Sequence, residues 1–154
     1  MKFFTLILTF FIFSNFVFSQ NESNKYNSKL AQKLEADEYG MKMYVMVILK
    51  TGERREFNES FSDSCFRGHM DNINRLMKAH KMVVAGPFEK NEKNYRGIFI
   101  LDVKTFDQAR DLLKEDPTIN EKILEAEFFH WYGSAAIPTY IENLDKITKK
   151  IIEF

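Results

Sequence analysis

Cysteine is almost missing from this chain, since Cys65 is the only one among 154 residues. A single cysteine cannot form an internal disulfide, which excludes a scaffold held together by disulfides. An excess of charge of one sign is also missing, because 22 lysine and arginine residues balance 22 aspartate and glutamate residues. A near-neutral surface has no electrostatic footprint for nucleic acid. We therefore expect a fold stabilised by its apolar core and no nucleic-acid partner.

A hydrophobic run long enough to span a membrane is missing too, although the chain begins with a shorter one. Residues 3–13 are almost wholly apolar, follow Lys2, and precede a Val-Phe-Ser sequence at residues 17–19 that suits signal peptidase. The run is shorter than the roughly 20 residues that a spanning helix needs. We predict a cleaved signal peptide over residues 1–19, a periplasmic or secreted protein, and no stable membrane anchor after cleavage. The alternative is an uncleaved N-terminal anchor.

The rest of the chain is long enough for one domain with a single core. Residues 20–40 are polar and rich in asparagine, and they predict a lead-in to the domain. The domain itself is expected over residues 41–137. Apolar residues at helical spacing predict an additional C-terminal helix within residues 138–154.

The spacing of apolar residues predicts six elements in the domain. Strands are predicted at residues 43–49, 82–85, 97–103 and 123–131, and helices at residues 66–80 and 105–113. Ser60 and Asp63 resemble a capping box before the first helix, and Pro117 is expected to end the second. The order of the elements predicts an α+β fold of the ferredoxin-like βαββαβ type. Its four-stranded antiparallel sheet would carry both helices on one face.

The predicted strands are apolar on both faces. In the first strand, Tyr44, Met46 and Ile48 point to one side, while Val45 and Val47 point to the other. Two helices cover only one face of such a sheet, so the other face needs a second cover. We expect a second copy packed sheet to sheet, which makes the protein a homodimer. The alternative is that the C-terminal helix folds across this face.

The topology separates the three histidines of the chain. His69 lies early in the first predicted helix, and Asp116 lies at the end of the second, which runs antiparallel to the first. The two residues therefore belong to the same end of the fold, whereas His80 and His130 fall at the opposite end. A carboxylate beside an imidazole fixes its tautomer, and such a pair can act in acid-base catalysis. His69 and Asp116 are the candidate catalytic pair, against the simpler interpretations of a surface histidine and a helix stop.

Other residues are candidates for lining a ligand pocket. Gly86, Pro87, Phe88 and Arg96 belong to the turn between the second and third strands, at the same end as His69. Trp131 is expected in core or dimer packing, or as a wall of the ligand site.

Two further chemistries are weaker. Cys65 precedes His69 by one helical turn, so a Cys/His nucleophile pair fits the spacing. Nothing in the sequence supplies an oxyanion hole for it, and a small tolerated residue is the simpler interpretation. His130 has no Cys, His or carboxylate at ligand spacing, so no metal site is expected.

Taken together, these motifs resemble the YciI-like (YCII-related) family of small dimeric α+β barrel proteins, over about residues 41–131. The residues that carry the resemblance are His69, Ile73, Leu76, the Val-Val-Ala-Gly-Pro-Phe run at residues 83–88, Gly97, Ala109, Asp116, Pro117 and Trp131. The resemblance implies a homodimer, an active site on His69 and Asp116, no cofactor, and no settled reaction. Family members with assigned chemistry are linked to the breakdown of small aromatic or chlorinated ring compounds. His80 stands where the family usually has glycine, which predicts a left-handed backbone there.

Three functions follow, in order of preference. The first is an exported enzyme that moves a proton on a small ring compound, in an isomerase or lyase type of reaction, with His69 as base or acid and Asp116 holding it. The second is a non-catalytic dimeric module that binds a small ligand in the same cleft. The third is haem handling, which a Soret band on the purified protein would reveal.

Overall fold

The computed structural model describes residues 25–149. The predicted signal peptide and the end of the predicted C-terminal helix lie outside these residues. In chain order the elements are α1 (Ser28–Lys33), β1 (Met41–Thr51), α2 (Glu59–Lys78), β2 (Met82–Pro87), β3 (Tyr95–Leu101), α3 (Phe106–Leu113), α4 (Pro117–Asn120), β4 (Leu124–Ser134), the 3-10 helix η1 (Ile137–Asn143) and α5 (Leu144–Ile147). Within residues 25–149, no helix is long and apolar enough to cross a bilayer.

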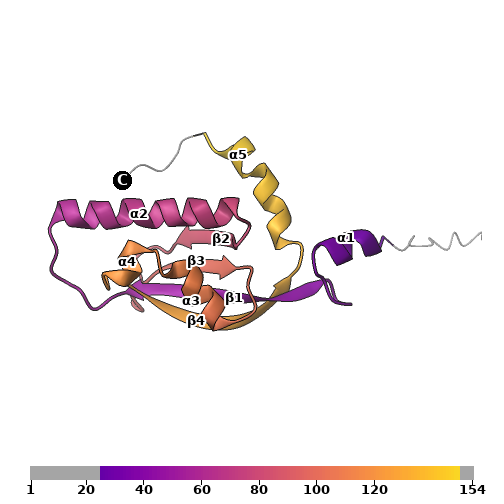
Figure 1. Ribbon diagram of the computed structural model, residues 1–154, viewed down its shortest axis with the longest axis horizontal. Helices are drawn as coiled ribbons and strands as arrows, with labels where there is room; N and C mark the ends of the chain where they lie inside the picture. Colours follow the sequence, from indigo (N-terminus) through magenta and orange to yellow (C-terminus); the bar gives the residue numbers. More distant parts are fainter. Residues whose placement is uncertain (1–24, 150–154) are drawn as a thin grey trace, which may run out of the picture.

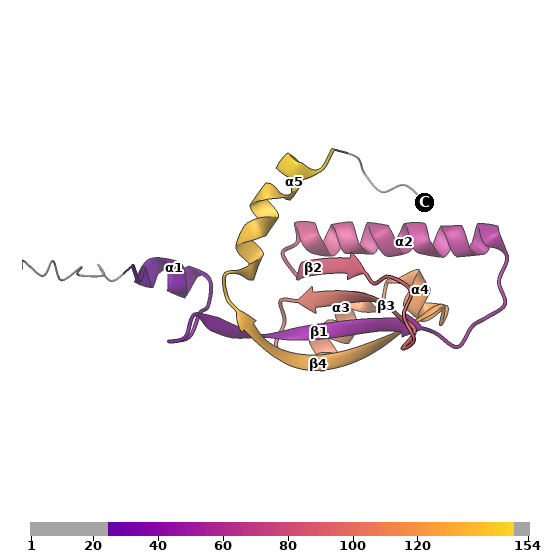
Figure 2. The same ribbon diagram turned by 180° about the vertical axis from the view of Figure 1, so that it is seen from behind.

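The four strands form one sheet in the order β2-β3-β1-β4, and every neighbouring pair is antiparallel. This is the arrangement that the sequence predicts, so the ferredoxin-like α+β fold is confirmed. Figure 1 shows α4 at the end of the fold where α2 begins, with η1 and α5 at the other end. Figure 2 shows the same arrangement from behind, with β1 and β4 running together along the sheet.

The main core lies between the sheet and the helices. Val45, Val47 and Leu49 alternate along β1 and face Leu76 of α2 and Leu113 of α3, and all five are at most 2% exposed. Burial of an aliphatic side chain of this size stabilises the fold by about 1.5–3 kcal/mol. Both helices therefore cover the same face, as expected.

The other face of the sheet is covered at one end by the chain itself. Tyr44, Val83 and Ile100 form a second buried cluster, against which Ile137 and Ile141 of η1 pack. In place of the expected long C-terminal helix, the described residues form the 3-10 helix η1 followed by the short α5. The packing of η1 against the sheet determines the path of this segment. The predicted alternative of a C-terminal segment folded across this face is therefore observed in part.

Two helix boundaries differ from the prediction. Asn58 rather than Ser60 caps α2, since its side chain accepts a hydrogen bond from Phe61 N. Pro117 begins α4 rather than ending α3, with Asp116 as the N-cap residue of the new helix. Proline suits the first turn of a helix because the amide proton that it lacks would have no helical acceptor there. This short helix is what holds Asp116 in place.

The end of β4 differs as well. Gly133 and Ser134, expected as a turn, continue the strand and pair with Lys42 and Met41 of β1. The ring of Trp131 lies over Gly133, where an added Cβ would approach it to 2.4 Å. The absence of a side chain at Gly133 thus makes room for the indole.

Candidate functional site

His69 and Asp116 meet inside the fold. His69 Nδ1 lies 2.7 Å from Asp116 Oδ2, although the two residues are 47 positions apart in the chain. His69 comes from the middle of α2 and is 8% exposed, while Asp116 is completely buried at the start of α4. The structure therefore shows the proximity that the topology argument predicts. The catalytic role of the pair stays a prediction.

Thr118 is a third member of this cluster, and the sequence interpretation missed it. Asp116 Oδ1 accepts hydrogen bonds from Thr118 N at 3.0 Å and from Thr118 Oγ1 at 2.6 Å. The hydroxyl oxygen also lies 3.2 Å from His69 Nδ1. Since its single proton goes to Asp116, this oxygen can act only as an acceptor towards the imidazole. The signal that could have revealed Thr118 is the Asp-Pro-Thr sequence, an N-cap residue followed by proline at the first helical position.

The electrostatics of the cluster fix how the imidazole is held. Burial by itself raises the pKa of Asp116, but the hydrogen bonds from His69 and Thr118 outweigh it and hold this pKa below its ordinary value. The carboxylate is then ionised at neutral pH and accepts without donating, so His69 Nδ1 must carry the proton. In the neutral ring, Nε2 is left as the nitrogen that can accept a proton. Phe66 and Phe99 flank the imidazole, with ring centroids at 6.2 and 5.7 Å.

The lowered pKa of Asp116 predicts a specific acid sensitivity. A carboxyl group whose pKa is lower in the folded protein stabilises the fold fully above its unfolded pKa, and this stability is lost as pH falls through the folded value. We expect the stability advantage of wild type over Asp116→Asn to shrink as pH falls below 3.8, the ordinary value of this pKa, towards the lowered value in the folded protein. Urea unfolding of both proteins between pH 2 and pH 6 measures it. An advantage that does not change with pH would contradict the assignment.

Gly68 allows α4 to come close to α2. A Cβ at this position would lie 2.6 Å from Pro117 Cγ, closer than real side-chain atoms approach. His69 follows Gly68 in the chain, and Asp116 precedes Pro117. The missing side chain at Gly68 therefore contributes to the short distance between His69 and Asp116.

Gly68→Ala is therefore expected to destabilise the protein. Glycine to alanine inside a helix usually gains about 1 kcal/mol, but overpacking against the rigid proline ring costs about 1–3 kcal/mol. Urea unfolding should show a net loss, and the NMR signals of the His69 ring should shift as α4 moves away. A variant more stable than wild type would show that the close approach is unimportant.

The predicted pocket residues of the turn between β2 and β3 lie at the expected end of the sheet but on the surface. Pro87 pairs with Gly97 in the register of the sheet, and Phe88 N donates to Arg96 O at 2.8 Å. Gly86 is half-buried, whereas Pro87, Phe88 and Arg96 are exposed. The structure thus places them at the same end of the fold as the pair of His69 and Asp116, which we call the dyad. Their contacts with a ligand stay a prediction.

Trp131 lies on the other face of the sheet from His69. Its ring packs against Tyr44 at a centroid distance of 5.8 Å, in the second buried cluster. Because Tyr44 and Val45 point to opposite faces, the sheet separates this indole from the imidazole of the same chain. Whether Trp131 also walls a ligand site stays a prediction.

The remaining two histidines and the cysteine do not belong to the cluster of His69, Asp116 and Thr118. His80 has φ 54°, the left-handed backbone expected of a residue in the place of glycine. His130 stacks on Phe106 at a centroid distance of 4.2 Å. Burial raises the pKa of the Cys65 thiol, which disfavours the nucleophilic thiolate. Among residues 25–149, no three His, Cys, Asp or Glu side chains are grouped so that they could hold a metal ion.

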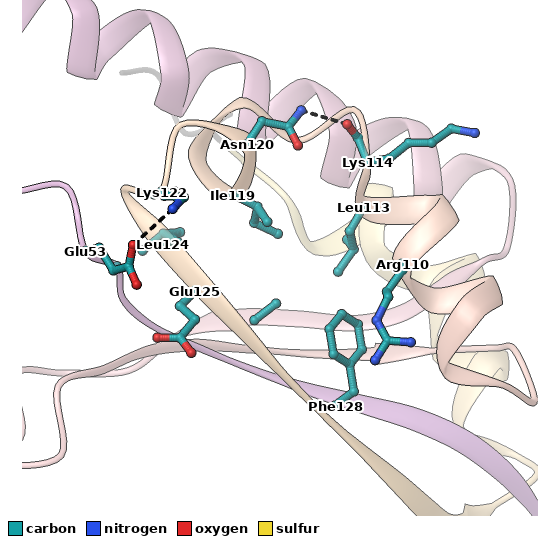
Figure 3. A pocket seen from close by; sticks show the side chains of 12 residues that line it. Glu53, Arg110, Leu113, Lys114, Ile119, Asn120, Lys122, Leu124, Glu125 and Phe128 are labelled. Carbon is teal, nitrogen blue, oxygen red and sulfur yellow. Dashed lines mark hydrogen bonds and ion pairs between the residues drawn. The ribbon is translucent and has the colours of Figure 1, made fainter.

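A cleft of about 420 Å³ lies beside α4, between α3 and β4 (Figure 3). Arg110 and Phe128 form one wall, and the guanidinium carbon lies 5.2 Å from the centre of the phenyl ring. Ile119 and Asn120 of α4 line it, but neither His69 nor Asp116 does. A second hollow of about 590 Å³ lies near His130 and Tyr132. The dyad therefore lies outside both hollows.

Comparisons with known proteins add little to this site. No family model matches the chain, and no curated protein matches it. Among solved structures, it is similar to 5-chloro-2-hydroxyhydroquinone dehydrochlorinase (TftG) from Burkholderia phenoliruptrix AC1100, in complex with 2,5-dihydroxybenzoquinone, with 18% identity over 56% of this chain and 92% of that chain and a TM-score of 0.38. A similarity at this level carries no conclusion about the site or the reaction of this chain. The resemblance to the YciI-like family stays a prediction that rests on the residues quoted for it.

Proposed function

We propose that this chain is a YciI-like small-molecule enzyme in which His69 transfers a proton and Asp116 holds it. The observation that carries the proposal is the buried cluster of His69, Asp116 and Thr118, in which Asp116 engages Nδ1 of the imidazole. The reaction is of the isomerase or lyase type on a small ring compound. Such a reaction needs only one well-placed proton carrier and little water.

The electrostatics favour proton transfer over other chemistry. When His69 Nε2 takes a proton, the resulting imidazolium lies 2.7 Å from the Asp116 carboxylate, which stabilises its charge. Burial strengthens this interaction, since the local dielectric constant is lower than that of water. The two side chains can therefore accept a proton at His69 Nε2 and return it by themselves.

A substrate screen tests the proposal. The chain from Gln20 onward would be incubated with hydroxylated, keto and chlorinated ring compounds, and the ultraviolet absorbance of each followed. Turnover by wild type that is absent in a folded His69→Gln variant is the expected result. Equal turnover by both proteins would refute the role of His69.

The cleft beside α4 favours a second candidate, a non-catalytic small-ligand-binding module. Its volume of about 420 Å³ suits a small ligand, and its lining excludes the dyad. This candidate predicts saturable binding without product that survives Asp116→Asn and is lost in Phe128→Ala. Loss of binding in Asp116→Asn alone would favour the enzyme.

We also propose that two copies associate through the uncovered part of the sheet. Beyond the end covered by η1, Met46, Ile48 and Ile98 are only half-buried, and Phe129 is 42% exposed. Light scattering should give a dimer for wild type and a monomer for Ile48→Glu, because a buried unpaired carboxylate opposes association. A monomeric wild type would contradict this part of the proposal.

Export is the last part of the proposal, and residues 1–19 support it by their composition. Sequencing of the mature N-terminus should find Gln20 first. A mature chain that begins at Met1 would contradict cleavage.

A further inference from the structure

Asn72 is a buried polar residue that the dyad does not explain. It lies one helical turn after His69 on the buried stripe of α2, which consists of Cys65, His69, Asn72 and Leu76. Its residue exposure is 5%. Side chains three positions apart on a helix have Cβ atoms about 5–6 Å apart. Asn72 and His69 can therefore reach neighbouring atoms of one small molecule.

The orientation of the Asn72 amide is fixed by its neighbour. Asn72 Oδ1 accepts a hydrogen bond from Arg75 Nη2 at 2.7 Å. A guanidinium group has donors and no acceptor, so the amide oxygen and not its nitrogen must face Arg75. Arg75 is itself held by an ion pair with Glu115, the residue before Asp116, at 3.2 Å. Asn72 Nδ2 must then point away from this surface pair and into the protein.

Asn72 Nδ2 is a buried donor without a hydrogen-bond partner among residues 25–149. An unsatisfied buried donor costs about 1–3 kcal/mol. A leucine at position 72 would have a similar size to asparagine and would avoid the cost of the unsatisfied donor. An unsatisfied buried group in a native fold calls for an explanation. One explanation is that the donor binds a ligand.

We propose that Asn72 Nδ2 donates a hydrogen bond to a phenolic or enolic oxygen of the molecule on which His69 acts. The inference rests on the proposed function and specifies its substrate class. About a tenth of the His69 side chain is exposed, and in this proposal the ligand reaches the imidazole at that opening. The substrate must then have the oxygen that Asn72 binds close to the atom from which His69 takes a proton.

The chemical step balances with these groups alone. His69 Nε2 takes a proton from a carbon next to a ring carbonyl, and the electron pair of the C–H bond becomes a C=C bond. The π pair of the carbonyl moves onto oxygen, and Asn72 Nδ2 donates to the resulting enolate. In a ring that carries a C=C bond next to this carbon, the enolate is conjugated with that bond. His69 then returns the proton to the far carbon of the bond, the carbonyl re-forms, and the double bond has moved by one position, which is an isomerisation. A phenol would bind in the same way. Its O–H proton passes to His69, and Asn72 Nδ2 donates to the phenolate oxygen that remains.

Binding of 4-nitrophenol tests the inference, because its absorbance reports the loss of the phenolic proton. The variants are Asn72→Leu, which removes the amide, and Asn72→Asp, which keeps an oxygen for Arg75 but loses the donor. Asn74→Leu is the matched control, since Asn74 is exposed on the same helix. Both Asn72 variants should bind 4-nitrophenol about 10- to 100-fold more weakly than wild type, as expected for one hydrogen bond to a charged oxygen. The control should bind like wild type.

The stability of the same variants gives a second readout. Asn72→Leu should raise the urea midpoint while it weakens binding, because it removes an unsatisfied donor. Unchanged affinity in Asn72→Asp, a lowered midpoint in Asn72→Leu, or no saturable binding by wild type would each overturn the inference. Failure of the proposed function would appear differently, as unchanged turnover in His69→Gln.

Discussion

Asp116→Ala is expected to lower the free energy of unfolding by about 2–4 kcal/mol, from a lost helix cap and unsatisfied buried donors. The alanine removes the cap of α4, to which Thr118 N donates. It also leaves His69 Nδ1 and the Thr118 hydroxyl without the carboxylate that joins them. The side chain is fully buried, so water does not replace these hydrogen bonds at low cost. Urea unfolding followed by circular dichroism measures the loss.

Glu115→Ala is the matched control for this prediction. Glu115 is the neighbouring acid, but it is exposed and pairs with Arg75 at the surface, so its loss should change stability by less than about 1 kcal/mol. A double-mutant cycle of Asp116→Ala with His69→Gln should give a coupling of about 1–3 kcal/mol. Equal costs for Asp116→Ala and Glu115→Ala would contradict the buried cluster.

His69→Gln is expected to reduce turnover of a substrate found by the screen by about 10²- to 10⁴-fold, the usual contribution of a general acid or base. Glutamine keeps a polar side chain of similar size on α2, so the fold should remain. Asp116→Asn should also reduce turnover, because an amide can present its own donor to Nδ1 and favour the wrong tautomer. Steady-state kinetics should place both effects mainly in kcat.

Folded variants are needed for this comparison. Circular dichroism and the NMR spectrum of His69→Gln should match those of wild type outside α2 and α4. Turnover within a factor of two of wild type in a folded His69→Gln would exclude acid-base catalysis by this residue.

The sequence predicts the sheet well and its C-terminal continuation poorly. Strand and helix periods differ enough to locate the six domain elements, and their order fixes the topology. At the C-terminus, Ile137 and Ile141 lie at a spacing that also fits a regular helix, and only their packing on Tyr44 and Val83 shows the observed path. Tertiary contacts of this kind are not encoded in local spacing.

The candidate site shows the same division. The topology predicts that His69 and Asp116 share one end of the fold, but their contact also depends on α4, which holds Asp116 beside the middle of α2. Thr118 was missed because its hydroxyl matters only once Pro117 begins α4. Asn72 was missed because an asparagine on a helix is usually exposed, and only the structure shows its burial.

The tautomer of His69 tests the central claim most directly. Long-range proton-nitrogen NMR at neutral pH, in wild type and Asp116→Asn with His69→Gln for assignment, distinguishes a proton on Nδ1 from one on Nε2. The buried carboxylate predicts a proton on Nδ1 in wild type and a shift of the population towards Nε2 in Asp116→Asn. A wild-type ring protonated mainly at Nε2, or the same population in both proteins, would contradict a dyad held by Asp116.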